Sequence, residues 1–354
     1  MSILFFEKVF LKKRKGNRPL RGVEIFNLNL IRELLAEGLE VTVACEKSWV
    51  SVIHDAMPEN EPKLLASPGL LSPVFCGLAC ASRAGTKKYD HLIIGNVGNG
   101  LIPSISLLRR THAFSRMVLI AHREVSAKFL KAVKMIPGHV VSVCGPIAKP
   151  FSEGGIAAAS HVDYGIMNAE KFTPCEAAGN ADGKVRFCVL GALDNAWKGA
   201  DTAIAAFNLL PDNLKGKVEL HLKAYEKETE LCEKAPGIFT YPWEPASTIP
   251  AFLRKMDVMI VPSRDEEVMR ETFSQATVQG MLSALPIIYS PLPILKEKFD
   301  NGGGICFDTV ESLAKAMATL ASDRILREKL GKEARATALD RYVWQTKRFI
   351  SRYL

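Results

Sequence analysis

The stretch from residue 256 to residue 290 constrains the fold most, because its hydrophobic pattern changes from strand to helix and back to strand. Met256–Pro262 is a short apolar run that ends in Pro-Ser, as expected for a buried parallel strand. Ser263–Arg270 is polar and acidic, which predicts a loop. Apolar residues return at helical spacing over Glu271–Leu282, and Leu285–Tyr289 predicts a second strand. This order is typical of an α/β fold with a parallel sheet.

The first half of the chain begins with the same alternation. Ser2–Phe6 predicts a strand, Val23–Glu37 an amphipathic helix and Leu39–Cys45 a second strand. Such a βαβ unit has a ligand crevice where the strand ends and the helix begins. Further strands are predicted in this half at His91–Gly95, Met117–Ala121 and His139–Cys144.

The chain is long enough, at 354 residues, for two domains. A polar tract, Cys175–Lys184, follows a crossing segment and marks the boundary between them. We expect a first domain over residues 1–168, a second over residues 169–338, and a C-terminal helix over residues 339–354 that crosses back to the first domain. Glu311–Leu354 is predicted to be helical throughout. The strands predicted in the second domain are Val185–Leu190, Val218–Leu222, Ile238–Tyr241, Asp257–Val261, Pro286–Tyr289 and Gly304–Phe307.

Composition indicates an ordinary globular protein, with 48% hydrophobic and 24% charged residues. The most apolar window, Leu64–Ala81, is interrupted by proline and glycine and does not predict a membrane-spanning helix. The chain starts directly with a strand-like run, so no signal peptide is expected. Its eight cysteines form no CxxC pair, which predicts reduced thiols and neither a zinc site nor disulfides. We therefore expect a cytoplasmic protein.

The net charge of +8 lies entirely in the first half, since residues 1–168 hold 21 Lys and Arg against 13 Asp and Glu. Part of this excess is the run Lys12–Lys15, followed by Arg18 and Arg21. A patch of this kind suits an anionic partner such as lipid headgroups or a phosphorylated acceptor. A solvated basic loop explains it equally well. Nucleic acid is not expected, because no aromatic residues alternate with the basic ones and no binding motif is present.

Two segments of the second half carry residue types that suit a phosphorylated sugar ligand. Lys198 lies in the glycine-bounded loop Gly191–Gly199, just before a predicted helix, where a lysine can bind a diphosphate as a point charge. A surface lysine in a turn is the alternative. At the predicted helix start after Glu271, the free N–H groups around Thr272, Phe273 and Ser274 could bind phosphate oxygens.

Glu271 and Gln279 could accept hydrogen bonds from the hydroxyl groups of such a ligand. Taken alone, Glu271 reads as a carboxylate favoured by the helix dipole, and Gln279 as a solvated helix residue. In the first half, Gly22 lies near the first helix start, although no GxGxxG motif accompanies it. His122 directly follows a predicted strand, where functional side chains gather in open α/β sheets. A capping or core histidine is the alternative there.

Residues 271–290, ETFSQATVQGMLSALPIIYS, resemble the donor-site signature E-x-F-G-x-x-x-x-E-A-M-A-x-G-x-P-V-I of the GT-B-fold group 1 glycosyltransferases, a large retaining family. Gly191–Gly199 with Asp201 resembles the G-R-L…K-G-x-D segment of that family, and Ile249–Ser263 resembles the segment ending in A-D-V-x-V-x-P-S. Weaker likenesses are Gly165–Phe172 to the linker P-N-G-V-D-x-x-x-F, Gly22 with Glu24 to the G-G-x-E loop, and His122 to a strand-end histidine.

The resemblance implies a GT-B fold, with two Rossmann-like α/β domains whose parallel sheets face each other across a cleft. It implies transfer of a sugar from a nucleotide-diphosphate donor, a UDP-sugar or GDP-sugar, to a hydroxyl of an acceptor with retention of configuration. Catalytic roles fall to His122, Glu271 and Lys198. Donor binding falls to Gly22, Lys198, Glu271, Thr272, Phe273, Ser274 and Gln279, with Glu271 on the sugar and Gln279 on the ribose. No cofactor is implied. No metal is expected either, because Asp265-Glu266-Glu267 does not form a DxD motif.

Four residues depart from the patterns of the family. Gln279 stands in place of its second glutamate, Ala192 in place of an arginine that faces the diphosphate, and Ser274 in place of a glycine. Val23 stands where the amino-terminal loop of the family often has a second glycine or alanine. These departures keep two alternatives open, a nucleotide-sugar-binding protein without transferase activity and a nucleotide-sugar 2-epimerase.

The basic first domain favours a sugar, lipid-linked or phosphorylated acceptor, as in lipopolysaccharide or polysaccharide assembly. Together with the absence of a signal peptide, it leads us to expect a cytoplasmic protein in peripheral contact with the inner face of an anionic membrane.

Overall fold

The chain folds into two compact units. Unit 1 comprises Met1–Met167 and Trp344–Leu354, and unit 2 comprises Asn168–Val343. The sequence placed the two boundaries after residues 168 and 338. The computed structural model describes residues 1–14, 16, 20, 22–68, 72–156, 159–162, 164–174, 182–191, 193, 195–223, 236–242, 244–265 and 271–354.

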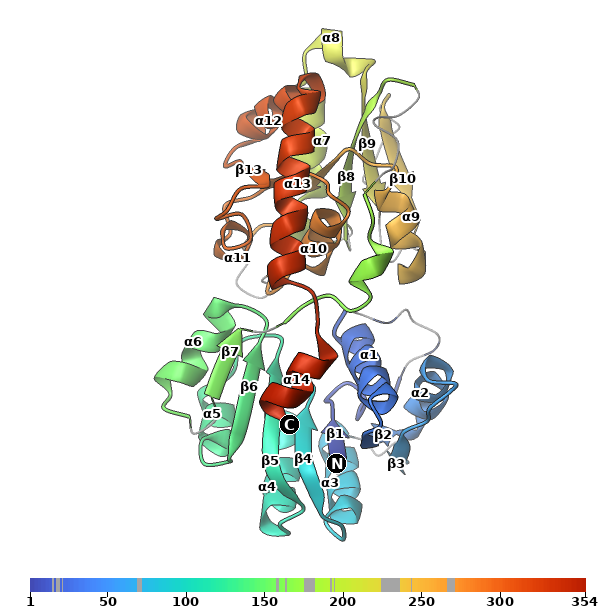
Figure 1. The fold of residues 1–354 in the computed structure, drawn as a ribbon, viewed down its shortest axis with the longest axis vertical. Helices are drawn as coiled ribbons and strands as arrows, with labels where there is room; N and C mark the ends of the chain where they lie inside the picture. Colours follow the sequence, from blue (N-terminus) through green and yellow to red (C-terminus); the bar gives the residue numbers. More distant parts are fainter. Residues whose placement is uncertain are drawn as a thin grey trace. The chain divides into compact units, whose positions relative to one another are not determined.

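Unit 1 is built on a seven-stranded sheet in the order β3-β2-β1-β4-β5-β6-β7, in which every neighbouring pair is parallel (Figure 1). The strands are β1 (Ser2–Phe6), β2 (Glu40–Glu46), β3 (Lys63–Ser67), β4 (Tyr89–Ile94), β5 (Phe114–Ala121), β6 (Gly138–Ser142) and β7 (Ala159–Val162). The helices are α1 (Gly22–Ala36), α2 (Val50–Ala56), α3 (Pro73–Ala84), α4 (Ile102–Arg110), α5 (Ala127–Val133), α6 (Gly145–Glu153) and α14 (Thr346–Tyr353).

Unit 2 is built on a six-stranded parallel sheet in the order β10-β9-β8-β11-β12-β13. The strands are β8 (Val185–Leu190), β9 (Val218–Lys223), β10 (Ile238–Tyr241), β11 (Val258–Val261), β12 (Ile287–Tyr289) and β13 (Gly304–Cys306). The helices are α7 (Ala200–Asn208), α8 (Asp212–Lys215), α9 (Ile249–Leu253), α10 (Gln275–Leu282), α11 (Pro293–Lys296), α12 (Val310–Ser322) and α13 (Arg324–Arg341).

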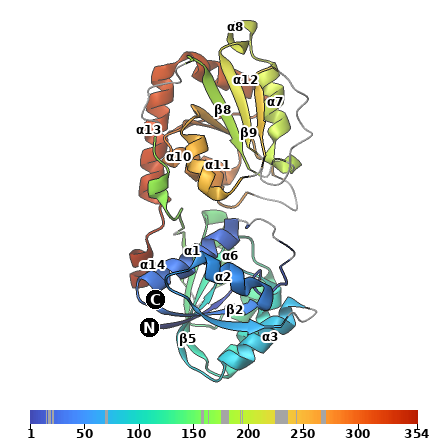
Figure 2. The ribbon, with the colours of Figure 1, turned by 90° about the vertical axis from the view of Figure 1, so that its right-hand side faces the viewer.

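Two helix layers cover the sheet of unit 2, with α7 and α12 on one face and α10 and α13 on the other (Figure 2). The first layer closes a core in which Phe187 and Leu220 of the sheet pack with Phe207 of α7 and Met317 of α12. A sheet covered on both faces requires strands that are apolar on both sides, which explains the continuous apolar runs in the sequence.

Each sheet has a switch point, where the chain stops adding strands on one side and starts on the other. In unit 1 this point lies between β1 and β4, and in unit 2 between β8 and β11. The carboxyl ends of two such strands diverge into separate loops and leave a crevice that side chains of both loops can line. We therefore expect ligand-binding side chains among the residues that follow β1, β4, β8 and β11.

The expected α/β class with parallel sheets is confirmed, whereas several element bounds are wrong. β3 and β7 were not predicted, because both are short edge strands with few large apolar residues. Glu311–Leu354 is not one helix. It is divided at Asp323, whose carboxylate accepts the Leu326 N–H at 2.8 Å and caps α13, and again at residues 342–345, before α14.

The predicted helix at Glu271 also starts later, since α10 begins at Gln275. Ser274 has a left-handed backbone, with φ 56° and ψ 70°, and an L-residue in that conformation cannot lie inside a right-handed helix. Glu271 is therefore a loop residue four positions ahead of the helix. Within the part of the chain that the structure describes, no helix is long and apolar enough to cross a membrane.

The last helix, α14, belongs to unit 1 and buries Phe349 and Tyr353. We predict that Phe349→Ala lowers the free energy of unfolding by about 3 kcal/mol, because a buried aromatic ring in contact with Trp344 is replaced by a cavity. Urea denaturation of the full chain measures this change. The exposed neighbour Lys347 serves as the control, and Lys347→Ala should change the stability by less than about 0.5 kcal/mol. Equal effects of the two substitutions would contradict the packing of α14.

Candidate functional site

The switch point of unit 2 brings Lys198 and Glu271 together, although 73 positions separate them in the sequence. The Lys198 ammonium lies 2.6 Å from Oε2 of Glu271, and the two side chains are only 15% and 9% exposed. Ser263 donates its hydroxyl to the same oxygen at 3.3 Å. Lys198 comes from the loop after β8, whereas Ser263 and Glu271 come from the segment after β11. Two of the predicted catalytic residues therefore form one half-buried, charge-assisted pair at a switch point.

Lys198 is held in place by contacts between the two loops. It ends a short 3₁₀ helix, Ala196–Lys198, and the next residue, Gly199, has φ 70°. A Cβ atom at Gly199 would collide with the carbonyl oxygen of Pro262, so the close approach of the two loops requires glycine there. Arg264 strengthens the same junction by donating its backbone N–H to the Trp197 carbonyl at 2.7 Å.

The segment that carries Glu271 is anchored by an aromatic cluster around a buried cation. Lys298 is 1% exposed, and its ammonium lies 4.6 Å from the ring centroid of Phe273 and 4.3 Å from that of Tyr342. A cation over two ring faces gains electrostatic stabilisation that partly offsets its desolvation. Phe273 is itself buried, which fixes the backbone two residues beyond Glu271.

The later start of α10 changes which backbone groups are available. Thr272, Phe273 and Ser274 precede the helix, so the N–H groups without intrahelical partners are those of the first helical turn, beginning at Gln275. Ser274 shares a hydrogen bond of 2.6 Å with the Thr277 hydroxyl, which ties the left-handed residue to that turn. The expected set of backbone donors is therefore shifted by about one turn along the chain.

Two buried polar atoms of unit 2 have no hydrogen-bond partner among the described residues. One is the side-chain oxygen Oε1 of Gln279 in α10, and the other is the indole nitrogen of Trp197, the residue before Lys198. Buried polar atoms are normally hydrogen-bonded, so this acceptor and this donor can serve ligand groups. Sequence reasoning missed Trp197.

Other sequence predictions for unit 2 concern residues that the structure does not describe, or a metal site. Ala192 lies outside the described residues, as do Glu266 and Glu267 of the acidic loop. Among the residues that the structure describes, no group of three or more His, Cys, Asp or Glu side chains is arranged to hold a metal ion.

The switch point of unit 1 is organised around a buried carboxyl group, Glu7, which directly follows β1. Its oxygens accept the Val9 N–H at 3.1 Å and the Asn27 side-chain amide at 3.3 Å. Asn27 also donates to the Gly95 carbonyl after β4 at 3.2 Å, and so joins the ends of the two strands. Burial raises the pKa of Glu7 to about 7, against the opposing effects of the Val9 hydrogen bond and the Arg123 charge.

His122 follows β5 as predicted, but it is 6% exposed and packed against two aromatic rings. The ring centroids of Phe26 and Tyr164 each lie 5.2 Å from its own. Burial lowers the pKa of His122 to about 3, against a hydrogen bond with the Gly95 backbone that raises it. The imidazole is therefore neutral near pH 7 and can act there only through hydrogen bonds. Its Nε2 atom has no such partner within the described part of the chain.

Gly22 is the exposed first residue of α1, and Glu24 of the same turn is buried. The residues that sequence reasoning missed in unit 1 are Glu7, Lys8 and Arg123. The signal that could have found them is the one used for His122, since Glu7 and Lys8 directly follow β1 and Arg123 is the second residue after β5.

We predict that Glu7→Gln changes the pH dependence of stability. Burial raises the pKa of Glu7 to about 7 from its usual 4.5, so the contribution of this group to stability is full below about pH 4.5 and falls as the pH rises to 7. Glutamine stays neutral, so the variant should gain about 3 kcal/mol relative to wild type between about pH 5 and 8. Urea denaturation across this range measures the difference. Glu37→Gln, at an exposed position of the same unit, should show the same pH dependence of stability as wild type. If Glu7→Gln also showed the wild-type pH dependence of stability, Glu7 would not have a raised pKa.

We also predict that Gly199→Ala destabilises unit 2 by about 2–3 kcal/mol, because the new methyl group meets the Pro262 carbonyl and φ is positive. Differential scanning calorimetry of the full chain measures the loss. Gly216→Ala is the matched control, because a Cβ there meets nothing within 4 Å. A Gly199 variant as stable as the Gly216 variant would contradict the tight junction between the two loops.

Comparisons with known proteins relate both the sequence and the fold of this chain to glycosyltransferases. Residues 176–337 match the family model described as glycosyl transferases group 1. No curated protein sequence matches the chain. Among solved structures, Anabaena HepE in complex with UDP aligns with a TM-score of 0.74 and 16% identity, over 97% of this chain and 96% of that one.

Two further structures show the same likeness over nearly the whole chain. Sucrose-phosphate synthase from Thermosynechococcus elongatus aligns with a TM-score of 0.70 and 16% identity, over 97% of this chain and 95% of that one. WaaB, a lipopolysaccharide outer core galactosyltransferase, aligns with a TM-score of 0.65 and 13% identity, over 97% and 96%. At such identities the likeness shows the fold, and the family model identifies the domain. The chain therefore has the GT-B fold of these structures, and its residues 176–337, in unit 2, match the group 1 glycosyltransferase family.

Proposed function

We propose that unit 2 binds a nucleotide-diphosphate sugar at the Lys198–Glu271 pair, and that the enzyme transfers the sugar to an acceptor hydroxyl with retention of configuration. The observation that carries this proposal is the pairing of these two side chains at the switch point of the sheet. A UDP-sugar is the favoured donor, because HepE was solved with UDP and with UDP-glucose. A GDP-sugar is the other candidate.

The ion pair suits both ends of such a donor. A diphosphate brings negative charge to the Lys198 ammonium, which is a mobile point charge and can turn toward it. The Glu271 carboxylate then becomes available to accept hydrogen bonds from sugar hydroxyl groups. The N–H groups of the first turn of α10 and the indole N–H of Trp197 supply further donors for phosphate oxygens. In this assignment the positive charge at the leaving group comes from the protein chain.

In the proposed reaction the bond between the anomeric carbon and the diphosphate oxygen breaks as the acceptor oxygen bonds to the same face of that carbon. The acceptor proton passes to the departing diphosphate oxygen. Lys198 and the backbone donors stabilise the charge that develops on the diphosphate, and such stabilisation acts mainly in the transition state. No residue of the chain needs to form a covalent bond to the sugar.

The other sequence-derived roles follow from this proposal. The unpaired Oε1 atom of Gln279 supports a hydrogen bond to a ribose hydroxyl, in the role expected from the signature. Gly22 at the start of α1 would contact the diphosphate, and His122 would line the acceptor side as a neutral hydrogen-bonding group.

For the acceptor, we propose a lipid-linked or phosphorylated sugar, used in lipopolysaccharide or polysaccharide assembly. Support comes from the basic first half of the chain and from the name of WaaB, which acts on the lipopolysaccharide outer core. Lys12 and Lys13 are exposed in unit 1, which suits peripheral contact with an anionic membrane on the cytoplasmic side.

The test is turnover of UDP-glucose, UDP-galactose, UDP-N-acetylglucosamine and GDP-mannose, measured as release of the nucleotide with and without sugar acceptors. We expect Glu271→Gln to lower kcat/KM at least about 10²-fold, because the charged acceptor at the sugar is lost. Removing the charge also leaves Lys198 half-buried without its partner, so a loss of stability is expected as well.

Glu219→Gln is the matched control for that loss. Its side chain is also 9% exposed and its carboxylate pairs with Lys184 at 2.8 Å. However, Glu219 lies at the amino end of β9, whereas the Lys198–Glu271 pair lies beyond the carboxyl ends of the strands. The control should lose stability and keep its rate. Nucleotide binding without turnover of any donor would indicate a binding protein. An epimerised UDP-N-acetylglucosamine formed without acceptor would indicate a 2-epimerase.

A further inference from the structure

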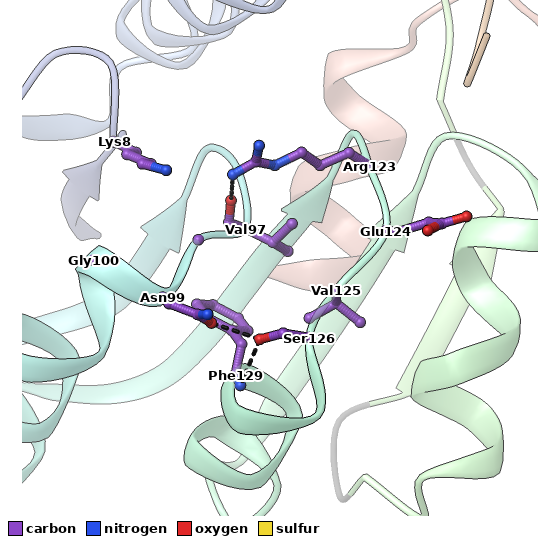
Figure 3. Close-up of a pocket in the computed structure, with 10 residues that line it drawn as sticks. Lys8, Val97, Asn99, Gly100, Arg123, Glu124, Val125, Ser126 and Phe129 are labelled. Atoms are coloured by element: carbon purple, nitrogen blue, oxygen red, sulfur yellow. Dashed lines mark hydrogen bonds between the residues drawn. The ribbon is translucent and has the colours of Figure 1, made fainter. Parts of the chain in front are cut away.

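A pocket of about 210 Å³ lies at the switch point of unit 1, and neither the sequence motifs nor the donor site accounts for it. Lys8 lines it after β1, Gly98 and Asn99 after β4, and Arg123 and Ser126 after β5 (Figure 3). Three adjacent strands of a parallel sheet therefore contribute their carboxyl-end loops to one pocket. Open α/β sheets bind their ligands at this kind of position.

Two cationic side chains meet at this pocket. The Cβ position of Gly98 lies 2.9 Å from Cδ and 3.6 Å from Nζ of Lys8, and 3.5 Å from Nη2 of Arg123. Both charges therefore lie close to the same backbone position. Partial burial lowers the pKa of Lys8, and the Arg123 charge lowers it further. The two charges repel each other in the folded protein.

Within the part of the chain that the structure describes, no salt bridge joins Lys8 or Arg123 to a carboxylate. Glu7 interacts with both cations through its charge, but burial raises its pKa to about 7, so it offsets them only in part near neutral pH. Arg123 is instead held in place by donating Nη2–H to the Val97 carbonyl at 3.0 Å. The Glu7 carboxyl is buried and already accepts two hydrogen bonds. Glu124 also lines the pocket, but its carboxylate points away from both cations (Figure 3).

The remaining wall of the pocket is fixed by its own hydrogen bonds. Ser126 donates its hydroxyl to Asn99 Oδ1 at 2.5 Å and accepts the Phe129 N–H at 3.2 Å. Phe129 itself is 1% exposed and forms an apolar base. This hydrogen-bonded wall and two cations that Glu7 offsets only in part favour an anionic ligand, because its charge reduces the repulsion between Lys8 and Arg123.

We propose that this pocket binds a phosphate group of the acceptor, with Lys8 and Arg123 as the residues that select for it. The planar guanidinium of Arg123 can offer two N–H donors to phosphate oxygens, and Lys8 adds a point charge. The volume is below the range of about 300–1,000 Å³ typical of pockets that enclose a whole small molecule. It therefore takes the phosphate and adjoining atoms of a larger acceptor. The identification of the ligand as the acceptor rests on the proposed function, whereas the assignment of an anion-binding site does not.

The test uses two sets of variants and two kinds of ligand, with isothermal titration calorimetry on the full chain. Inorganic phosphate and glucose 6-phosphate probe the pocket, glucose is the neutral control, and UDP probes unit 2. We expect glucose 6-phosphate to bind, with Kd in the millimolar range or tighter, and glucose to show no binding. Lys8→Gln and Arg123→Gln should each weaken glucose 6-phosphate binding at least about tenfold and leave UDP binding unchanged.

Matched controls separate charge at this pocket from charge elsewhere. Lys13→Gln removes an exposed cation of the same unit and should leave glucose 6-phosphate binding unchanged. Arg123→Lys keeps the charge and should retain part of the affinity. Lys198→Gln should weaken UDP binding and leave glucose 6-phosphate binding unchanged. If UDP fails to bind while glucose 6-phosphate binds through Lys8 and Arg123, the donor assignment fails and the anion pocket stands.

Sedimentation with phosphatidylglycerol vesicles distinguishes a lipid phosphate from a soluble one. Vesicle binding that is lost in Lys8→Gln and Arg123→Gln assigns the phosphate to a lipid headgroup. Vesicle binding that depends on Lys13, together with sugar-phosphate binding that depends on Lys8 and Arg123, assigns it to a soluble or polar part of the acceptor. The proposal is overturned if neither phosphate probe nor vesicles bind in a way that responds to Lys8 and Arg123, at concentrations up to about 50 mM.

Discussion

The ion pair between Lys198 and Glu271 is the interaction on which the proposed donor site depends. Taking two charges out of water costs several kcal/mol per ion, and their attraction offsets this only when the geometry is good. The geometry here comes from the sheet, because β8 and β11 are neighbours and their loops are locked together where Gly199 meets Pro262. The pair thus stabilises the junction of the two loops and keeps both charges in place. In the proposed donor complex, a diphosphate would take the place of Glu271 beside Lys198, and hydroxyl groups of the sugar would donate hydrogen bonds to the Glu271 carboxylate.

The same topology produces a different electrostatic result in unit 1. There the carboxyl group at the switch point, Glu7, is buried among hydrogen-bond donors with a pKa raised to about 7, and His122 is neutral because its pKa is lowered to about 3. Glu7 can therefore offset only part of the positive charge of Lys8 and Arg123 near neutral pH, and the neutral His122 contributes no charge. The two switch points thus differ in how far the chain neutralises them, because Lys198 has a salt-bridge partner whereas Lys8 and Arg123 have none among the described residues.

Sequence reasoning found the central elements and lost accuracy where long-range contacts decide. β1, β8 and β10 have the predicted bounds, because Glu7, Gly191 and Pro242, which directly follow them, interrupt the strand pattern. The start of α10 could not be predicted, since Phe273 fits the helical spacing but is held outside the helix by Lys298 and Tyr342, which lie 25 and 69 positions away. The family likeness identified Lys198 and Glu271. Their direct contact required the order of strands in the sheet, which no local pattern contains.

Lys8 and Arg123 show what a composition-based reading of charge misses. The run Lys12–Lys15 dominates the sequence because its residues are adjacent, although Lys12 and Lys13 at its start are exposed and can each be solvated by water. Lys8 and Arg123 are 115 positions apart and are brought together only by the neighbouring ends of β1, β4 and β5. A parallel sheet places such residues at one edge whatever their separation. At that edge, a cation that is paired within the chain, such as Lys198, can exchange its carboxylate partner for an anionic ligand. A cation without a salt-bridge partner, such as Lys8, is stabilised only when an anionic ligand binds. The first arrangement suits a leaving group that must come and go, and the second suits recognition of an acceptor.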